Sequence, residues 1–417
     1  MSDFKSLNLL PSILTEIERK GYINPTTIQS KSIPVLLKGS DLLGIAQTGT
    51  GKTASFSLPI IDRLGRLSTR PEPLQVRALI LAPTRELATQ IHKNICSYSK
   101  GLKINSAIII GGVRKENQIE ELKDGMDIVV STPGRLMDLM GGGHIRFDEL
   151  EVFVLDEADM MLDFGFYEDV KTISSKLPKE RQTALFSATM PRQIEELAKK
   201  LLNNPVKVQS APQSSTISKI EQLVYFVEEN DKLALLQMLL ADESIQRVLV
   251  FCKAKYGVIN VVEDLAKNGI SHGEIHSNRT QTQRDEAIAE FSEGKIRVLV
   301  ATDIAARGID VLDVTHVINF NLPDDATYYV HRIGRTARAG KDGVAISLCG
   351  ERDLALLRNV QRQIKKDIPT ILDHPFHKEF PPLKVKKKRV GSSASFRERK
   401  RPSQAKRRAK KKFLENL

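Results

Sequence analysis

The sequence has few aromatic residues and few cysteines, and both shortages exclude classes of protein. Aromatic residues make up 5% of the 417 residues and tryptophan is absent, which does not suit a β-sandwich with an aromatic core. The three cysteines, Cys96, Cys252 and Cys349, lie far apart and form neither a metal-binding pair nor a disulfide framework. This cysteine usage fits a reducing, cytoplasmic compartment.

Long hydrophobic runs are also missing. No apolar run approaches the roughly 18 residues of a membrane-spanning helix. The first twenty residues lack the apolar core and the small-residue cleavage site of a secretion signal. We therefore expect neither secretion nor a membrane partner.

Outside its C-terminal end the chain has almost no net charge. The total is +12, but residues 384–417 hold 15 Lys or Arg and two Glu, so this segment carries +13 and the remainder −1. Residues 371–417 have little to bury, and we expect a disordered basic tail there. The tail could grip RNA phosphates, dock a protein, direct localisation or only aid solubility.

The body of the chain alternates short apolar runs with amphipathic segments. This alternation predicts an α/β fold with parallel sheets in two domains, residues 1–209 and 219–370, joined by a polar linker at 210–218. We expect helices at Lys232–Leu240 and Tyr256–Lys267. The expected strands are Asp41–Ala46, Ala78–Ala82, Ser106–Ile110, Asp127–Val130, Val152–Leu155, Ala184–Phe186, Arg247–Phe251, Val298–Ala301 and Val314–Phe320.

The segment AQTGTGKT, residues 46–53, has the composition of a phosphate-binding loop between a strand and a helix. Backbone N–H groups of such a loop point at a phosphate chain. Lys52 would neutralise the β- and γ-phosphates, and Thr53 would hold a magnesium ion. The general pattern begins with glycine and this chain has Ala46, so a glycine-rich turn with a chance lysine is the alternative.

A second apolar strand ends in acidic residues, in VFVLDEAD at 152–159. A carboxylate at the C-terminal end of a parallel strand can meet the phosphate loop in one crevice. Asp156 would then hold the magnesium ion, and Glu157 would orient and deprotonate an attacking water. Without the phosphate loop, a solvated turn would explain these acids equally well.

Arginines recur every three residues in HRIGRTARAG, residues 331–340. An arginine that reaches the γ-phosphate from another domain acts as an arginine finger. A solvated basic surface is the alternative explanation of such a run.

Together, in this order and spacing, these motifs resemble the DEAD-box ATP-dependent RNA helicases of superfamily 2, and more narrowly the bacterial RhlE-type group. The resemblance covers residues 1 to about 365. It implies two RecA-like parallel-sheet domains in tandem, with ATP between them and single-stranded RNA across both. It further implies an RNA-stimulated ATPase that uses ATP and Mg²⁺ to unwind or remodel short RNA duplexes and RNA–protein complexes.

The resemblance also implies an ATP site. The segment GYINPTTIQ (21–29) matches the adenine-recognition motif, in which Gln29 would read the adenine edge and Tyr22 would stack near the ring with support from Phe4. Asp310 would contact the ribose, and Arg335 and Arg338 the γ-phosphate. The loop residues Thr48, Gly49, Thr50, Gly51, Lys52 and Thr53 would bind the phosphates, and the implied catalytic residues are Lys52, Asp156, Glu157, Arg335 and Arg338.

Coupling and RNA contacts are implied in the same way. The SAT segment at 187–189 would link the nucleotide site to unwinding. Its Ser187 and Thr189 would bond with Asp159 and His331. The RNA contacts implied are Thr84, Arg85, Gly112, Thr132, Arg135, Gln281, Arg284 and Thr302, mainly to phosphates and 2′-hydroxyls. Each of these glycines and threonines, taken singly, could equally form a plain turn or helix cap.

Two positions depart from the family pattern. The family often has threonine where this chain has Ala254, so a phosphate contact is missing there, which Lys253 or Lys255 could supply. The last motif often has glycine where this chain has Ala337, and we expect no change in the geometry of the neighbouring arginines.

Other readings of the same motifs stay open. An ATP-gated RNA clamp or annealing factor would share every motif, and a P-loop ATPase acting on DNA or protein is a second rival. We expect a monomer, and ribosome assembly, RNA decay and cold adaptation are all compatible settings.

Overall fold

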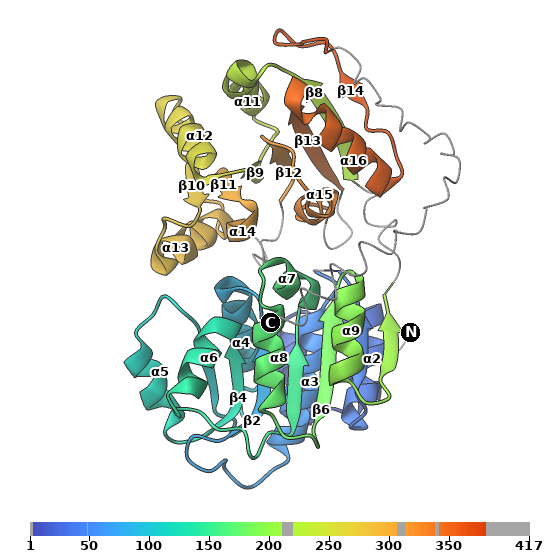
Figure 1. The fold of residues 1–417 in the computed structure, drawn as a ribbon, viewed down its shortest axis with the longest axis vertical. Coiled ribbons are helices and arrows are strands. Elements are labelled where there is room, and N and C mark those ends of the chain that lie inside the picture. Colours follow the sequence, from blue (N-terminus) through green and yellow to red (C-terminus); the bar gives the residue numbers. More distant parts are fainter. Residues whose placement is uncertain (1–2, 48, 211–219, 307–313, 338–341, 381–417) are drawn as a thin grey trace, which may run out of the picture. The chain divides into compact units, whose positions relative to one another are not determined.

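The computed structural model describes residues 3–47, 49–210, 220–306, 314–337 and 342–380 (Figure 1). In this part of the chain, two parallel seven-stranded sheets follow one another in sequence. We call residues 3–210, which hold the first sheet, the first lobe, and residues 220–380, which hold the second, the second lobe. The parallel α/β architecture expected from the sequence is confirmed.

The first sheet has the strand order β3-β4-β2-β5-β6-β1-β7. Its strands are β1 (Leu42–Ile45), β2 (Val76–Leu81), β3 (Ser106–Ile109), β4 (Met126–Ser131), β5 (Val152–Leu155), β6 (Gln182–Ser187) and β7 (Val206–Gln209). Its helices are α1 (Pro11–Arg19), α2 (Thr27–Leu37), α3 (Lys52–Gly65), α4 (Arg85–Tyr98), α5 (Lys115–Leu122), α6 (Pro133–Gly141), α7 (Ala158–Asp163), α8 (Tyr167–Ser175) and α9 (Arg192–Leu201), after a 3₁₀ turn at Lys5–Leu7.

Helices cover both faces of this sheet, which explains why its central strands are buried along their whole length and rich in apolar residues. One hydrophobic core joins one face to α1–α4, and another joins the opposite face to α5–α9. All residues of β2, β4, β5 and β6 are buried. At Gly44 in β1, an added Cβ would lie 2.5 Å from a ring carbon of Phe186, so only glycine fits between these strands.

The second sheet has the order β10-β11-β9-β12-β13-β8-β14. Its strands are β8 (Ile220–Phe226), β9 (Val248–Cys252), β10 (His272–Ile275), β11 (Val298–Thr302), β12 (His316–Asn319), β13 (Gly343–Cys349) and β14 (Thr370–Ile371). Its helices are α11 (Lys232–Ala241), α12 (Lys255–Lys267), α13 (Gln281–Ser292), α14 (Asp303–Ala306), α15 (Ala326–Ile333) and α16 (Leu354–Ile364), with 3₁₀ turns at Glu229–Asp231 and Glu351–Asp353.

All nine strands and both helices expected from the sequence are present, with ends that differ by at most two residues. Five strands were missed, for different reasons. Strand β7 is exposed at three of four positions, β10 reads HGEI, and β14 has two residues, so none shows an apolar run. Strands β8 and β13 have clear apolar positions that the sequence analysis did not assign.

The sequence places residues 371–380 in the disordered tail, but in the structure they pack on the second lobe. Ile371 belongs to β14, which pairs in parallel with β8. Phe376 packs against a core of this lobe, and the Phe380 ring lies 6.0 Å from the Phe226 ring. These apolar side chains give the proline-rich segment enough surface to bury. The expected linker at 211–218 and the tail from 381 lie outside the described residues.

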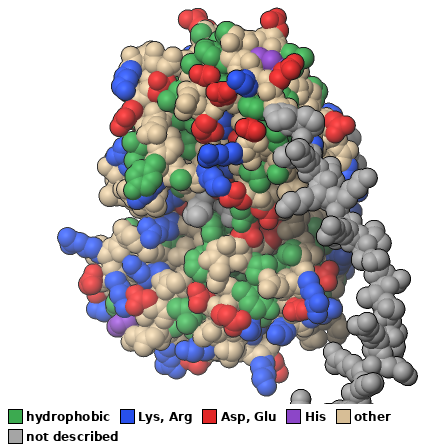
Figure 2. All heavy atoms as spheres, turned by 45° about the horizontal axis from the view of Figure 1, so that its top comes forward, with side chains coloured by type: hydrophobic (Ala, Val, Ile, Leu, Met, Phe, Trp, Pro, Cys, Tyr) green, Lys and Arg blue, Asp and Glu red, His purple; other side chains and the backbone are tan. Residues whose placement is uncertain are grey.

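Cationic and anionic side chains are mixed over the face of the molecule shown in Figure 2. This mixture agrees with the near-zero net charge of the chain outside its basic end. No helix in the described part of the chain is long and apolar enough to cross a membrane.

Candidate active site

Three neighbouring strands of the first sheet, β5, β6 and β1, end in the motifs singled out from the sequence. The glycine-rich loop follows β1, the acidic motif follows β5, and the SAT segment ends β6. Because parallel strands have their carboxyl ends at one edge, the three motifs meet there. Leu42 of β1 and Val154 of β5 both lie opposite Ala184 of β6, and this register sets how far each strand extends toward the shared edge.

The glycine-rich loop has a backbone that favours glycine and ends in a helix N-terminus. Gly49 and Gly51 have φ angles of +80° and +91°, and α3 begins at the next residue, Lys52. The Thr50 hydroxyl donates to the Gln47 carbonyl at 2.7 Å, which ties the loop together. Thr53 is half-buried in the first turn of α3. This arrangement directs N–H groups and helix dipole toward one point, as anion sites do.

A buried cluster of three charges lies at this edge. The Lys52 ammonium is 5% exposed and lies 3.6 Å from a Glu157 oxygen and 3.9 Å from an Asp156 oxygen. Both distances are ion-pair distances, longer than a direct hydrogen bond. Burial opposes the charge of Lys52, but Glu157 and Asp156 outweigh it and raise the pKa of Lys52 above its ordinary value.

The two acids of this cluster are held differently. Burial raises the pKa of Asp156 to about 6, against Lys52, which lowers it, and with Glu157, which adds to the rise. The Asp156 carboxylate accepts the Glu157 N–H at 2.9 Å. Glu157 has a φ angle of +50° and precedes α7, in a backbone conformation that non-glycine residues rarely adopt. Backbone strain of this kind clusters at functional sites.

The SAT segment is bonded to the acidic motif through Asp159. The Thr189 N–H and hydroxyl both donate to one Asp159 carboxylate oxygen at 2.8 Å. The Asp159 N–H donates to the Ser187 hydroxyl at 3.3 Å, which in turn donates to the Thr189 carbonyl at 2.7 Å. These bonds join the ends of β5 and β6. The expected bond to His331, in the last turn of α15, stays a prediction.

The adenine-motif residues lie against the phosphate loop. Gln29 is buried, and its side-chain amide donates to the Gly51 carbonyl at 3.2 Å while its oxygen accepts the Thr26 N–H at 2.9 Å. Phe4 is buried, and its ring stacks beside the Tyr22 ring with centroids 6.4 Å apart. Tyr22 is 36% exposed, so its ring can still meet a flat ligand.

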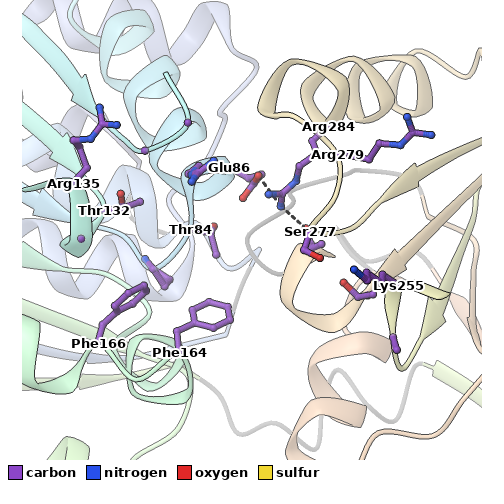
Figure 3. Close-up of a pocket in the computed structure, with 18 of the residues that line it drawn as sticks. Thr84, Glu86, Thr132, Arg135, Phe164, Phe166, Lys255, Ser277, Arg279 and Arg284 are labelled. Atoms are coloured by element: carbon purple, nitrogen blue, oxygen red, sulfur yellow. Dashed lines mark hydrogen bonds and ion pairs between the residues drawn. The ribbon is translucent and has the colours of Figure 1, made fainter. Parts of the chain in front are cut away.

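The predicted RNA contacts of the first lobe line a single cavity of about 930 Å³, shown in part in Figure 3. Thr84 caps α4 and accepts the Leu87 N–H at 3.2 Å. Gly112 has a φ of +84° and lies so close to the Arg85 guanidinium that a Cβ would meet it at 2.3 Å. The residues of this lobe that line the cavity are Pro83, Thr84, Arg85, Glu86, Gly111, Gly112, Thr132, Gly134, Arg135, Asp138, Phe164 and Phe166.

Arg135 is held in place within this lining. It lies in the first turn of α6, and its guanidinium donates to the Gln118 side chain at 3.1 Å and to the Val113 carbonyl at 3.3 Å. Thr132 caps the same helix without a side-chain cap bond. Its hydroxyl, unlike that of Thr84, is therefore not occupied by capping.

Of the RNA contacts expected in the second lobe, Arg284 and Thr302 line the same cavity. Thr302 ends β11, while Gln281 and Arg284 lie in the first turns of α13. Both α13 side chains reach Glu86. Gln281 donates to it at 3.0 Å, and the Arg284 guanidinium lies 2.8 Å from the same carboxylate oxygen. Lys253 and Lys255, flanking Ala254, also line the cavity.

The first arginine of the arginine motif has a structural role. Arg332 is 2% exposed and makes a two-bond fork with Asp303, at 2.5 and 2.6 Å. It also donates to the Asn319 side chain and the Asn321 carbonyl. Arg335 is buried and follows α15. Thr48, Asp310 and Arg338 lie outside the described residues.

Several residues of the site escaped the sequence analysis. Glu86 was not singled out, and Arg332 was named only through the run of three arginines to which it belongs. Phe164 and Phe166 gave no signal beyond a Phe-Gly-Phe sequence. The unchanged geometry expected for the arginines beside Ala337 stays a prediction, and Ala337 itself has a φ of +55°. A left-handed backbone favours glycine, which explains the family's usual residue there.

Comparison with known proteins agrees with this geometry. Residues 26–197 match the family model described as DEAD/DEAH box helicase, and residues 231–340 match the helicase conserved C-terminal domain. The chain is 40% identical to the DEAD-box ATP-dependent RNA helicase CshA of Geobacillus kaustophilus, over 88% of this chain and 77% of that protein. It is 44% identical to the RNA helicase CrhR of Synechocystis, over 88% and 74%.

A solved structure shows the same fold. The chain is similar to S. cerevisiae Dbp5 bound to RNA and ADP BeF3, with a TM-score of 0.79 and 32% identity. The match covers 89% of this chain and 95% of that one.

We predict that Arg332→Ala destabilises the second lobe by about 3 kcal/mol, because it leaves the Asp303 carboxylate without its buried partner. Arg332→Lys keeps the charge but loses the two-bond fork, so it should restore only part of this loss. Hydrogen exchange of peptides from β12 and α15 measures the effect locally. Arg352→Ala, at an exposed position of the same lobe, is the control. Equal protection in Arg332→Ala and Arg352→Ala would contradict the structural role.

Proposed function

We propose, from the premise that this chain belongs to the DEAD/DEAH box helicase family, which of its residues bind ATP, hydrolyse it and bind RNA in an ATP-dependent RNA helicase. The observation that carries the proposal is the buried cluster of Lys52, Asp156 and Glu157, bonded through Asp159 to the end of β6. The cluster marks where ATP is hydrolysed. The Asp159 network marks a route from that place to the neighbouring motifs.

ATP is the substrate that these residues suit. Gln29, which already bonds to the phosphate loop, presents the rest of its amide to an adenine edge, and the Tyr22 ring stacks beside the base. The loop N–H groups and Lys52 hold the phosphates. Asp310 contacts the ribose, and Thr48, Gly49, Thr50 and Gly51 shape the loop.

A magnesium ion fits the same place. The Thr53 hydroxyl and the Asp156 carboxylate supply oxygen ligands, which Mg²⁺ prefers, and few protein ligands suffice because water and phosphate oxygens complete its shell. Among the described residues, no group of three or more acidic, histidine or cysteine side chains is placed to hold a metal ion. When bound, the ion neutralises phosphate charge.

Hydrolysis then needs a base and cations at the γ-phosphate. Glu157 orients a water molecule and takes its proton as the oxygen attacks phosphorus and the bond to the leaving ADP oxygen breaks. Arg335 and Arg338 stabilise the charge on the transferred group. Lys52 holds the same phosphates from the first lobe.

Single-stranded RNA follows the cavity lining. Thr84, Arg85, Gly112, Thr132 and Arg135 bind its phosphates and 2′-hydroxyls in the first lobe. The contacts in the second lobe are Gln281, Arg284 and Thr302. Contacts of this kind carry little sequence preference. Dbp5 bound to RNA and ADP BeF3, a structural relative, supports RNA as the ligand.

ATP binding and RNA binding are coupled because both ligands favour the same arrangement of the two lobes. ATP and RNA together favour closed lobes, in which the second-lobe arginines reach the γ-phosphate and a bent single strand fits better than a duplex. Ser187, Thr189, Asp159 and His331 relay the change. Each ligand should therefore tighten the binding of the other. Loss of the γ-phosphate reopens the lobes and releases the RNA.

We propose from the family resemblance that the chain belongs to the RhlE-type group, with domain limits near residues 209 and 219. We also propose that it is a cytoplasmic monomer that works on ribosomal precursors or in RNA decay. The relatives CshA and CrhR are bacterial RNA helicases, which supports a role in bacterial RNA remodelling.

We predict that Glu157→Gln lowers RNA-stimulated ATP turnover by about 10²- to 10⁴-fold, the usual contribution of a general base. Because the amide still fills the site, RNA binding with a non-hydrolysable ATP analogue should persist. Glu151→Gln, at the opposite end of β5, is the matched control and should leave turnover unchanged. A strand-displacement assay on the same proteins separates an unwinding enzyme from a clamp. Normal turnover in Glu157→Gln would show that another group is the base.

A second prediction concerns the basic end of the chain. Deleting residues 384–417, which carry +13, should raise the RNA concentration for half-maximal ATPase and flatten its dependence on salt, because fewer counterions are released on binding. The rate at saturating RNA should not change. An unchanged half-maximal concentration at low salt would exclude an RNA-binding role for the tail.

A further inference from the structure

The turn between α7 and α8 carries two phenylalanines into the cavity that the proposed RNA path follows (Figure 3). Phe164 is the C-cap residue that follows α7 and Phe166 precedes α8, with Gly165 at a φ of +79° between them. The backbone of the turn is bonded to α7: the Phe164 N–H donates to Met160 at 3.1 Å and the Phe166 N–H to Met161 at 2.9 Å. Both rings therefore extend from a turn whose backbone is held by hydrogen bonds.

The two rings have different surroundings. Phe166 packs against the core that joins the first sheet to α5–α9, whereas Phe164 belongs to none of the hydrophobic cores of the described residues. Phe164 is nonetheless half-buried, and its ring meets that of Phe166 edge-on, with centroids 6.2 Å apart and planes at 64°. Phe166 thus anchors the pair, and Phe164 extends it into the cavity.

The rest of the lining says what an aromatic ring would meet there. Phe164 and Phe166 are the aromatic side chains among the described lining residues, and their first-lobe neighbours include the guanidinium groups of Arg85 and Arg135 and the hydroxyl of Thr132. These polar groups suit phosphates and ribose hydroxyls but not a nucleobase face. An aromatic ring beside a phosphate-binding strip is the arrangement by which proteins hold single-stranded nucleic acid without reading its sequence.

We propose that the Phe164 ring stacks on a nucleobase of the bound single-stranded RNA, with Phe166 as its edge-on support. The proposal rests on the RNA path proposed above. It adds to that path a contact with a base, and one that accepts any of the four bases because each has a π-face. In an A-form duplex each base stacks on its neighbours. A base that stacks on Phe164 has to give up that stacking, so the contact favours the single strand over the double strand.

The first test is a substitution series at residue 164. Stacking on one aromatic ring predicts that Phe164→Ala raises the Kd for a single-stranded RNA oligonucleotide roughly 5- to 150-fold, measured by fluorescence anisotropy with a non-hydrolysable ATP analogue present. Phe164→Tyr should bind like the unsubstituted protein, and Phe164→Leu should stay weak although it is apolar. If Leu restores binding as well as Tyr does, the ring fills space only and the proposal is overturned.

The absence of tryptophan from this chain permits a direct second readout. Phe164→Trp introduces a single fluorophore at the proposed contact, and a stacked base should quench its emission with the same RNA dependence as the anisotropy. Tyr167→Trp is the matched control, because Tyr167 lies in the same segment but does not line the cavity. RNA binding without quenching at residue 164, or equal quenching at residue 167, would overturn the proposal.

Arg135→Ala separates this inference from the path on which it rests. If Arg135→Ala weakens RNA binding and Phe164→Ala does not, the path stands and the stacking contact is wrong. If neither substitution weakens binding, the RNA does not follow this cavity, and both are wrong. Weakening by both, with recovery in Phe164→Tyr, is the result that we expect.

Discussion

The buried ammonium of Lys52, between the carboxylates of Asp156 and Glu157, is the interaction around which the first lobe is arranged. Two adjacent acids removed from water repel each other, and burial raises the pKa of Asp156 accordingly. A cation brought by the N-terminus of α3 offsets this cost. The cluster thus concentrates charge at the end of the phosphate loop, and these are the groups that we propose hold and hydrolyse ATP.

The strand order of the first sheet brings the charge cluster next to the other motifs. Because β6 lies between β5 and β1, the SAT segment ends beside both the acids and the phosphate loop. The two Thr189 bonds to Asp159 then tie the acidic motif to the end of β6. The first-lobe part of the cavity lining comes from α4, α6 and the turn after α7, which follow other strands of the same sheet. The proposed nucleotide site and the first-lobe part of the proposed RNA path are therefore carried by one sheet, which is a physical basis for the coupling proposed between them.

How much the sequence can predict depends on how local each feature is. Asp156 and Glu157 follow an apolar strand directly, and Lys52 and Thr53 follow another after a short glycine-rich loop, so the strand pattern places all four at one edge of a parallel sheet. Arg332 could not be sorted from its neighbours, because its role depends on Asp303, which lies far along the chain. The same holds for Glu86, whose partners lie on α13. Phe164 stands in no sequence pattern, and only the fold shows that it lines the cavity.

The central claim is that RNA on the cavity lining and ATP at the charge cluster act as one system. Its most direct test is steady-state ATP hydrolysis by the full chain, alone, with single-stranded RNA, and with single-stranded DNA of the same length. The account predicts strong stimulation by RNA and little by DNA, since 2′-hydroxyls are among the groups the lining suits. Equal rates with and without RNA would contradict the coupling, and equal stimulation by DNA would contradict the choice of RNA.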